Sequence, residues 1–135
     1  MLRVRDVMTH SVVTLSPEMS LAEAMGTLST IGVSGAPVCD AAGQVVGVFS
    51  QSDVVKLDGS VPTGARVESL MTAKVLSVGL DEGLEAAIGA LAKHGVHRLM
   101  VLDAEGGLSG IITPMDVVRA IARGKLVVQE PGGGS

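Results

Sequence analysis

Residues 47–55, Gly-Val-Phe-Ser-Gln-Ser-Asp-Val-Val, align with residues 110–118, Gly-Ile-Ile-Thr-Pro-Met-Asp-Val-Val. Extended outward, the match pairs Val4–Leu57 with Val67–Ala120 without a gap, at a constant offset of 63 and with 18 of 54 positions identical. Two copies are too few for a solenoid, which generally needs about three repeats or more. We therefore expect the two copies to pack face to face about a pseudo-two-fold axis.

The repeat predicts how the 135-residue chain is divided. We expect a first repeat over residues 4–57 and a second over residues 67–123. Residues 58–66 between them are rich in turn-forming residues and are predicted to be a linker. Residues 124–135, which end in Gly-Gly-Gly-Ser, are predicted to be a flexible tail outside the fold.

Composition limits the class of protein. Hydrophobic residues make up 47% and charged residues 18%, which indicates a folded domain rather than a disordered chain. A net charge of -4, a single Phe and the absence of Trp and Tyr disfavour nucleic-acid binding, which uses basic surfaces and aromatic stacking. No apolar run approaches the ~18 residues of a membrane helix. With Cys39 as its one cysteine and no signal-peptide pattern, the protein is expected in the cytoplasm.

Each repeat is predicted as β-α-β-β-α, a mixed α/β fold of one small three-stranded sheet and two helices. The first strand is expected at residues 12–14 and, in the second copy, at 75–77, where β-branched residues gather. Ser20, with Glu23 three residues later, has the spacing of a helix capping box. Gly32 and Gly95 stand where these helices should end. Helical spacing predicts apolar faces from Leu21, Ala24, Met25, Leu28 and Ile31, and from Leu84, Ala87, Ile88 and Leu91.

The second half of each repeat is predicted as a hairpin followed by a helix. Strands over residues 35–39 and 45–50 are joined by a short loop that ends with Gly43. The last helix begins near Ser50 in the first repeat. In the second it begins at Thr113, where Pro114 occupies the first helical position and its missing N–H costs nothing.

These segments resemble the CBS-domain family, named after cystathionine β-synthase, in its tandem or Bateman form. Residues 13–24 are similar to that family's first strand and helix, and residues 32–38 to the entry of its second strand. Residues 47–53 and 110–116 resemble its Gly-x-x-Ser/Thr-x-x-Asp ribose motif. The resemblance implies a regulatory module that binds adenosine-containing ligands in clefts between the repeats and pairs into a disc-shaped dimer.

Asp116, three residues after Thr113, has two interpretations. A carboxylate in the first turn of a helix is favoured by the unpaired N–H groups there, so the pair can be a capping box that needs no ligand. The resemblance adds that the hydroxyl caps the helix while the carboxylate accepts hydrogen bonds from the ribose hydroxyls.

His97 and Arg98 are the candidate phosphate contacts, because a guanidinium offers a planar set of donors. The alternative is a strand residue whose side chain is merely solvated. By the resemblance, the base would lie against aliphatic residues of the first repeat. The better cleft then comprises His10, Val12, Val33, Ser34, Ala36, His97, Arg98, Ile111, Thr113 and Asp116. A second, weaker cleft would use Ser50, Asp53, Lys74 and Val96.

Other chemistry-bearing residues have simpler explanations. Lys56 and Arg119, three residues after each aspartate, could reach a phosphate, although a solvated helix face explains them as well. His94 and His97 are spaced for a metal, but Gly95 interrupts the helix and no third ligand is evident, so no metal site is predicted. Cys39 is expected to be a small buried hydrophobe.

Two functions of different classes remain. The first is a regulatory, ligand-sensing module that binds AMP, ADP, ATP or S-adenosylmethionine as a regulatory ligand, without another cofactor. It would be a homodimer and would act in trans on an effector protein whose identity is unknown. The alternative is a structural dimerisation module with vestigial clefts. No nucleophile elbow or phosphate-binding Walker loop is recognisable, so the protein is not expected to be an enzyme, and partnership with nucleic acid or membrane is not expected.

Overall fold

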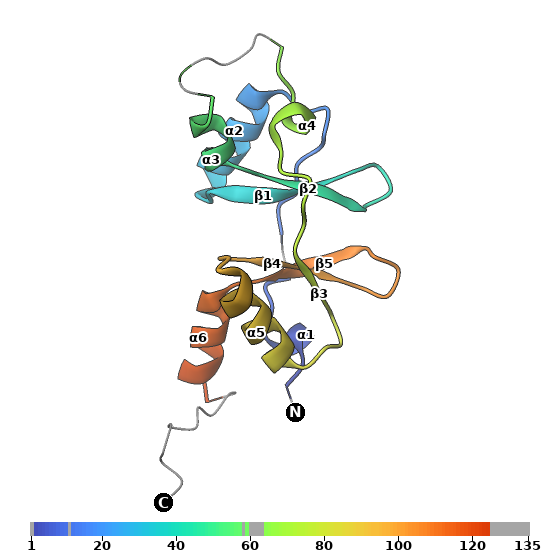
Figure 1. The fold of residues 1–135 in the computed structure, drawn as a ribbon, viewed down its shortest axis with the longest axis vertical. Coiled ribbons are helices and arrows are strands. Elements are labelled where there is room, and N and C mark those ends of the chain that lie inside the picture. Colours follow the sequence, from blue (N-terminus) through green and yellow to red (C-terminus); the bar gives the residue numbers. More distant parts are fainter. Residues whose placement is uncertain (1, 11, 58, 60–63, 125–135) are drawn as a thin grey trace, which may run out of the picture. The chain divides into compact units, whose positions relative to one another are not determined.

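The structure is a computed structural model that describes residues 2–10, 12–57, 59 and 64–124. The first repeat contains α1 (Val4–Val7), α2 (Leu21–Ile31), β1 (Gly35–Cys39), β2 (Val45–Ser50) and α3 (Gln51–Val55). The second contains α4 (Val67–Leu70), β3 (Ser77–Gly79), α5 (Leu84–His94), β4 (Leu99–Leu102), β5 (Leu108–Ile112) and α6 (Pro114–Ala122). Figure 1 gives these labels on the ribbon.

The chain forms two compact units that do not coincide with the two sequence repeats. Unit 1 takes its described residues from Met1–His10, Ser77–Asp103 and Ser109–Ser135. Unit 2 takes its described residues from Ser11–Leu76 and Ala104–Leu108. Residues 2–10 thus belong with the second repeat, and α4 belongs with the first.

Unit 2 is built around the β1–β2 hairpin. The two strands pair antiparallel with Ala36 opposite Phe49, and Gly43 closes the loop with a positive φ of 82°. The apolar face of α2 packs on this hairpin. Val67 of α4 joins the same core, which comprises Leu15, Leu21, Ala24, Leu28, Ala36, Val38, Phe49 and Val67.

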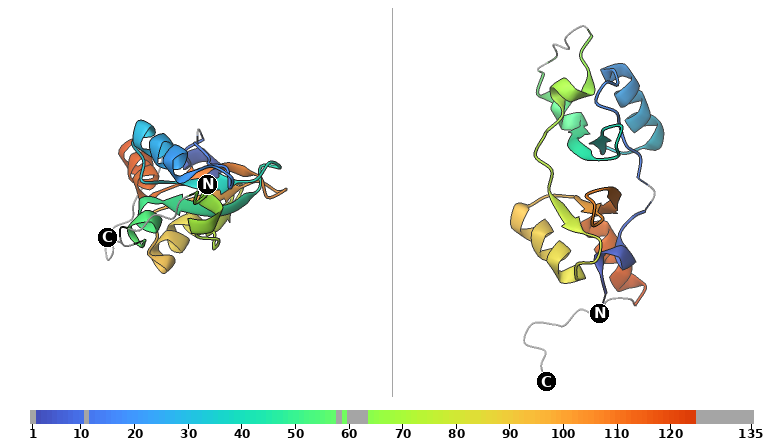
Figure 2. Two further views of the ribbon diagram at one scale, coloured as in Figure 1. Left: turned by 90° about the horizontal axis from the view of Figure 1, so that it is seen from above. Right: turned by 90° about the vertical axis from the view of Figure 1, so that its right-hand side faces the viewer.

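Unit 1 has a three-stranded sheet in the order β3-β4-β5, in which β3 and β4 are parallel. The short helix α1 contacts both α5 and α6, and Figure 1 and the right-hand view of Figure 2 place it beside them. Val4 of α1 is fully buried, as Val67 is in unit 2. Each unit is therefore completed by a helix from the start of the other repeat.

Equivalent backbone hydrogen bonds hold these two exchanged segments. In unit 1 the N–H of Val4 donates to the carbonyl of Glu82 at 2.9 Å, and Thr9 and Ile111 exchange hydrogen bonds at 2.8 and 3.1 Å. In unit 2 the equivalent donors and acceptors, 63 residues away in sequence, make the same contacts: Val67 to Met19 at 2.9 Å, and Thr72 with Val48 at 2.9 Å in both directions. The sequence repeat is therefore also a repeat of main-chain contacts.

Most predicted elements are confirmed, as is the mixed α/β class. The predicted three-stranded sheet is present in unit 1, whereas the sheet of unit 2 has two strands, β1 and β2. The hairpin strands lie at residues 35–39 and 45–50 as predicted. Ser20 caps α2 by accepting from the N–H of Glu23, and Gly32 and Gly95 end α2 and α5 in the left-handed conformation. Thr113 caps α6, with Pro114 as its first residue.

The first strand of each repeat was predicted in the wrong place. Leu15, rather than residues 12–14, bridges to Val38, so this strand is reduced to one contact; in the second repeat β3 begins at Ser77 instead of residue 75. A run of β-branched residues forms a strand only where a partner strand accepts its hydrogen bonds, and Leu15 is the residue that reaches β1. Strand β4 likewise begins at Leu99, after His97 and Arg98.

The predicted apolar helix faces are too wide at two positions. Ile31 is 45% exposed and Ile88 37% exposed, whereas Leu21, Ala24 and Leu28, and their counterparts Leu84, Ala87 and Leu91, are buried. Helices α1 and α4 were not predicted, because four residues are too few to show helical periodicity. Most of the predicted linker (58 and 60–63) and nearly all of the tail (125–135) lie outside the described residues.

Candidate functional site

Two buried aspartates occupy the same position in the first turn of a helix. Asp116 is the third residue of α6 and is 5% exposed, while Asp53 is the third residue of α3 and is 7% exposed. Each belongs to a capping box, in which the carboxylate reaches back to the N-cap backbone N–H. The capping interpretation of the Ser/Thr-x-x-Asp motif is therefore confirmed in both repeats.

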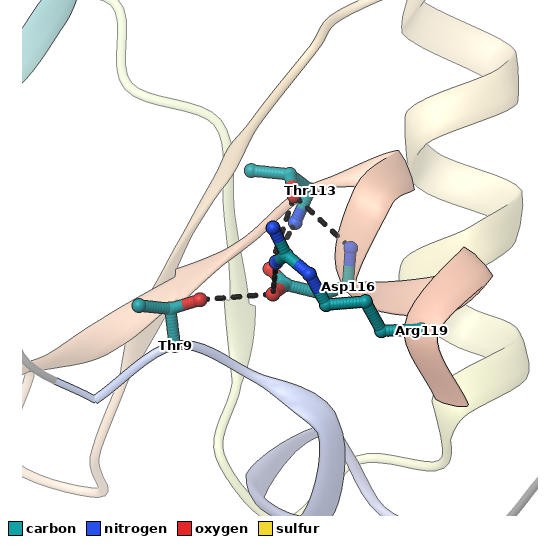
Figure 3. Close-up of polar contacts among 4 residues, drawn as sticks. All are labelled: Thr9, Thr113, Asp116 and Arg119. Atoms are coloured by element: carbon teal, nitrogen blue, oxygen red, sulfur yellow. Dashed lines mark hydrogen bonds and ion pairs between the residues drawn. The ribbon is translucent and has the colours of Figure 1, made fainter. Parts of the chain in front are cut away.

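The surroundings of Asp116 use both carboxylate oxygens (Figure 3). Oδ2 accepts from the backbone N–H of Thr113 at 2.9 Å and from its hydroxyl at 3.1 Å. Oδ1 accepts from the hydroxyl of Thr9 at 2.8 Å and from the Arg119 guanidinium at 3.4 Å. Because a carboxylate has about four acceptor positions, all are occupied. The Arg119 contact is the longest, and the Arg119 side chain is 55% exposed.

The surroundings of Asp53 repeat this arrangement without the cation. Oδ2 accepts from the backbone N–H of Ser50 at 2.8 Å and from its hydroxyl at 3.4 Å, and Oδ1 accepts from the hydroxyl of Thr72 at 3.2 Å. Lys56 occupies the position that corresponds to Arg119. No ion pair from Lys56 to Asp53 occurs among the residues that the structure describes.

A hollow of about 400 Å³ lies beside Asp116, between the α1 segment and α6, and we call it the α1–α6 cavity. All of its walls belong to unit 1. Its polar lining comprises Asp6, Thr9, His10, Asp116, Arg119 and Arg123. The chain thus places three basic side chains next to a buried carboxylate.

The structure brings some of the predicted site residues together. In unit 1, Thr113 and Asp116 are hydrogen-bonded, and His10 lines the same cavity as Asp116. Ile111 pairs through its backbone with Thr9. His97 is exposed and Arg98 half-buried just before β4; neither they nor Val96 line the α1–α6 cavity.

The remaining predicted residues belong to unit 2. Ser50 and Asp53 form the capping box of α3. Val33 and Ser34 are exposed between α2 and β1, Val12 is half-buried, and Lys74 is exposed. Ala36 is part of the buried core of its unit. That residues of both units share one cleft stays a prediction.

Sequence reasoning missed the two threonines that hold the aspartates. Thr9 and Thr72 are an identical pair in the repeat, and this was the signal that could have identified them. Their contact partners lie 107 and 19 residues away in sequence, so spacing within one repeat does not reveal the contact. Arg119 is solvated, as one interpretation held, yet it also pairs with Asp116.

Comparison with known proteins gives the family. The CBS-domain family model matches residues 4–60 and 67–123, the two halves of the internal repeat. The chain is a member of the CBS-domain family. It is a tandem CBS pair, as its resemblance indicated, and the boundaries of the match lie close to those of the repeats.

Solved structures of other CBS pairs have the same fold. The structure of CBSX2 from Arabidopsis thaliana in complex with AMP matches this CBS pair with a TM-score of 0.84 and 35% identity, over 93% of this chain and 100% of that one. The CBS pair of protein MJ0100, solved with 5′-methylthioadenosine and S-adenosyl-L-methionine, matches with a TM-score of 0.78 over 93% of this chain and 99% of that one. At 24% identity, this second likeness supports the fold alone.

Curated relatives include longer proteins. Inosine-5′-monophosphate dehydrogenase of Methanocaldococcus jannaschii is 31% identical over 84% of this chain, and subunit gamma-3 of human 5′-AMP-activated protein kinase is 35% identical over 66% of it. The CBS pair spans only 22% and 20% of these two relatives. An uncharacterised 17.7 kDa protein of Acidianus ambivalens is 27% identical over 88% of this chain and 73% of its own length.

The described part of the chain has neither a membrane-spanning helix nor a metal-binding cluster. Within residues 2–10, 12–57, 59 and 64–124, no helix is long and apolar enough to cross a membrane. The same residues contain no group of three or more His, Cys, Asp or Glu side chains placed to hold a metal ion.

Proposed function

We propose that this CBS pair is a regulatory module that binds an adenosine-containing nucleotide at Asp116 and does not catalyse a reaction. One observation carries the proposal: a buried carboxylate, fixed at the start of α6, lines an open cavity together with arginine side chains. A carboxylate held in this way can accept a ribose hydroxyl in place of Arg119, whose 3.4 Å contact is the longest of its four. The likeness to CBSX2, whose structure contains AMP, supports the same ligand class.

The ligand would act by shifting a conformational equilibrium of the protein. A ligand that binds one arrangement of the two units better than another favours that arrangement by its difference in affinity. We further propose that the output is passed in trans to a partner protein. The gamma-3 subunit relative belongs to a multi-subunit kinase by its name, which supports a role for CBS pairs next to other chains.

We also propose that the functional form is a homodimer. Val55 is 76% exposed, and Met115 and Val118 are each 53% exposed, so apolar side chains on helices α3 and α6 are uncovered in a single chain. Burying such residues against a second copy would remove them from water. Light scattering at micromolar concentration should give the mass of two chains; the mass of one chain contradicts this part of the proposal.

Calorimetric titration with AMP, ADP, ATP and S-adenosylmethionine tests the ligand class. Replacing Asp116 by Asn keeps the shape of the side chain but removes its charge. Asp116→Asn should weaken nucleotide binding by about 1.5–3 kcal/mol, roughly tenfold to a hundredfold, because a hydrogen bond to a charged acceptor is lost. Asp53→Asn is the matched control and should weaken binding less.

The amino-acid composition allows a second test of ligand binding, by ultraviolet absorbance. With neither Trp nor Tyr, the protein absorbs very weakly at 280 nm, so a co-purified purine would dominate its ultraviolet spectrum. A ligand at a hundred times its dissociation constant adds about 2.7 kcal/mol to stability and should raise the melting temperature. If no adenosine compound at millimolar concentration shifts the melting curve or binds in the calorimeter, the dimerisation-only alternative replaces this proposal.

A further inference from the structure

Met8 and Met71 are the one pair of methionines that the internal repeat keeps at equivalent positions. Every other methionine has a different residue type at the equivalent position; Met25, for example, corresponds to Ile88. Each member of the pair directly precedes a threonine whose hydroxyl donates to a buried aspartate. A chemical change at either sulfur therefore acts one peptide unit away from a contact that holds an aspartate.

The sulfur of Met71 lies against the backbone of β2. A Cβ added at Gly47 would be 2.7 Å from this sulfur, so the sulfur occupies the space that a side chain there would need. Met71 also packs against the buried core of unit 2, which includes Phe49. Two backbone N–H groups close by are already used, since Thr72 and Val48 donate to each other's carbonyl at 2.9 Å. The place suits an apolar thioether, and these two donors are not available to an added oxygen.

The two equivalent sulfurs differ in their exposure to solvent. The Met8 side chain is buried, with 8% exposed, whereas Met71 is half-buried. A small oxidant in water therefore reaches Met71 more readily than Met8, because oxidation of methionine follows exposure. Cys39, the one thiol, is a poor competitor: burial and the charge of Asp40 raise the pKa of its thiol and lower the fraction of reactive thiolate.

We propose that Met71 makes unit 2 sensitive to oxidation: conversion of its thioether to the sulfoxide loosens the Met71–Thr72 segment and releases Asp53 from Thr72. The co-reactant is a hydroperoxide, such as hydrogen peroxide. A lone pair of the sulfur attacks one peroxide oxygen, the O–O bond breaks, and a sulfur–oxygen bond forms. The sulfur loses two electrons and the peroxide gains them; the displaced hydroxide takes the proton of the transferred oxygen and leaves as water.

The sulfoxide cannot keep the position of the thioether. Its oxygen is a strong acceptor, and a buried acceptor without a donor is destabilising, so the side chain leaves its place against Gly47 for water. The space left there removes packing from the segment that ends at Thr72. The hydroxyl of Thr72 is 3.2 Å from Asp53, and this longer contact of the equivalent pair is the more easily lost. Because Asp53 caps α3 through the N–H of Ser50, the start of α3 loosens with it.

Unit 1 contains the same arrangement in a protected form. A Cβ added at Gly110 would be 3.1 Å from the sulfur of Met8, so this sulfur also faces a glycine of a strand. Its burial limits contact with the oxidant, and the hydroxyl of Thr9 holds Asp116 at the shorter distance of 2.8 Å. Oxidation therefore acts on unit 2 and leaves the Asp116 site unchanged.

Peroxide treatment of the folded chain, followed by peptide mass spectrometry and by NMR of backbone hydrogen exchange, tests the proposal. Wild-type protein should accumulate sulfoxide at Met71. The N–H groups of Ser50 and Thr72 should then exchange about tenfold faster, as expected for loss of a hydrogen bond to a charged acceptor, while that of Thr113 keeps its rate. The melting temperature should fall by about 3–6 °C. Treatment with methionine sulfoxide reductases should restore both values.

Single variants assign the effect to one sulfur. Met71→Leu keeps a similar side-chain volume but cannot form a sulfoxide, so peroxide should change neither its exchange rates nor its melting temperature. Met8→Leu changes the equivalent residue of unit 1, and Met115→Leu removes an exposed sulfur from α6; both are matched controls and should respond to peroxide as the wild type does. Met71→Gln places a polar group at the same position and should show the faster exchange without any oxidant.

Three results would overturn the inference. The first is a Met71 that stays a thioether while Met115 is fully oxidised, which would mean that the folded chain shields it. The second is a Met71 sulfoxide with unchanged exchange at Ser50 and Thr72. The third is an undiminished response to peroxide in Met71→Leu, which would assign the sensitivity to another residue. None of these measurements involves a nucleotide, so their outcome is independent of the proposed function.

Discussion

The Asp116 site of unit 1 and the Asp53 site of unit 2 have the same backbone but different side chains. Both aspartates are buried third residues of a capped helix, and both accept a hydrogen bond from a threonine of the exchanged segment. Around Asp116 the threonine contact is 2.8 Å long and Arg119 is added; around Asp53 the threonine contact is 3.2 Å long.

This difference separates what the fold requires from what a ligand requires. The contacts present at both sites either cap a helix or join an exchanged segment to its unit, so they are explained by folding. The basic residues present at one site only are not needed for folding, since unit 2 forms the same backbone without them. Asymmetry between the repeats is therefore the better guide to function.

The largest expected difference between the two units is the loss of stability when Gly110 or Gly47 is replaced by alanine. A Cβ at Gly110 would lie inside contact distance of the Thr9 carbonyl oxygen, and the Met8 sulfur would be 3.1 Å away. A Cβ at Gly47 would meet the Met71 sulfur at 2.7 Å and the Thr72 carbonyl oxygen at 2.9 Å. Because backbone cannot move aside as a side chain can, Gly110→Ala should cost about 3 kcal/mol and Gly47→Ala about 1–2 kcal/mol.

Guanidinium denaturation of the two variants measures these costs. Gly26→Ala is the control, because a Cβ there has no atom within 4 Å and alanine favours the helix. It should be neutral or slightly stabilising. Equal stability of Gly110→Ala and wild type would mean that the Met8–Thr9 segment does not pass against β5 in solution.

The repeat explains how much of the fold could be predicted from the sequence. Caps, helix-ending glycines and the hairpin are local features, so Ser20, Gly32 and Thr113 were sufficient to place them. The exchange of α1 and α4 between units could not be predicted, because a repeat boundary in sequence does not say which body a segment packs against. Val4 and Val67 resemble any other buried valine until their neighbours are known.

The residues of the candidate site could also be predicted only in part. Thr113 and Asp116 were identified from motif spacing and are hydrogen-bonded as expected. Asp6 and Thr9 were not, because sequence alone does not bring the α1 segment next to α6. Arg123 was not identified either, although it stands at the C-terminal end of the helix that contains Asp116. Arg119 was considered, but only the structure shows its contact with Asp116.

Removal of the threonine hydroxyls should destabilise the Asp116 site more than the Asp53 site. Thr9→Val deletes a donor that lies 2.8 Å from Asp116 and should cost about 1.5–2 kcal/mol, since the acceptor is charged and buried. Thr72→Val deletes a longer contact of 3.2 Å and should cost about 0.5–1 kcal/mol. Denaturation midpoints measured side by side give the order, and a larger loss for Thr72→Val would show that the Asp53 site is the tighter one.

The helix caps also differ between the repeats, but here the first repeat has the additional contact. Ser20 accepts the Glu23 N–H at 3.2 Å at the start of α2, whereas Gly83 gives α5 no side-chain cap. Ser20→Ala should destabilise the protein by about 1 kcal/mol, and Gly83→Ser should stabilise it by about 0.3 kcal/mol. The Cβ at Gly83 would meet only the mobile end of the Glu85 side chain, at 2.6 Å, so it can be accommodated. If thermal unfolding shows that Gly83→Ser destabilises, the equivalence of the two caps is wrong.

Cys39 gives the smallest expected difference between the units, since Leu102 replaces it in the other repeat. It is half-buried rather than fully buried, and burial, with a smaller contribution from the charge of Asp40, raises the pKa of its thiol. A thiol with a raised pKa in the folded state favours folding in its protonated form. This contribution to stability is complete below the pKa of the thiol in the unfolded chain, about 8.5. It is lost as the pH rises through the higher pKa of the thiol in the folded state.

Wild-type stability should therefore fall more steeply above pH 8.5 than that of Cys39→Val, while the two should show the same pH dependence near pH 7. Denaturation midpoints across this range, measured with reductant present, provide the check. Parallel curves for the two proteins would show that the thiol is as accessible in the folded chain as in the unfolded one.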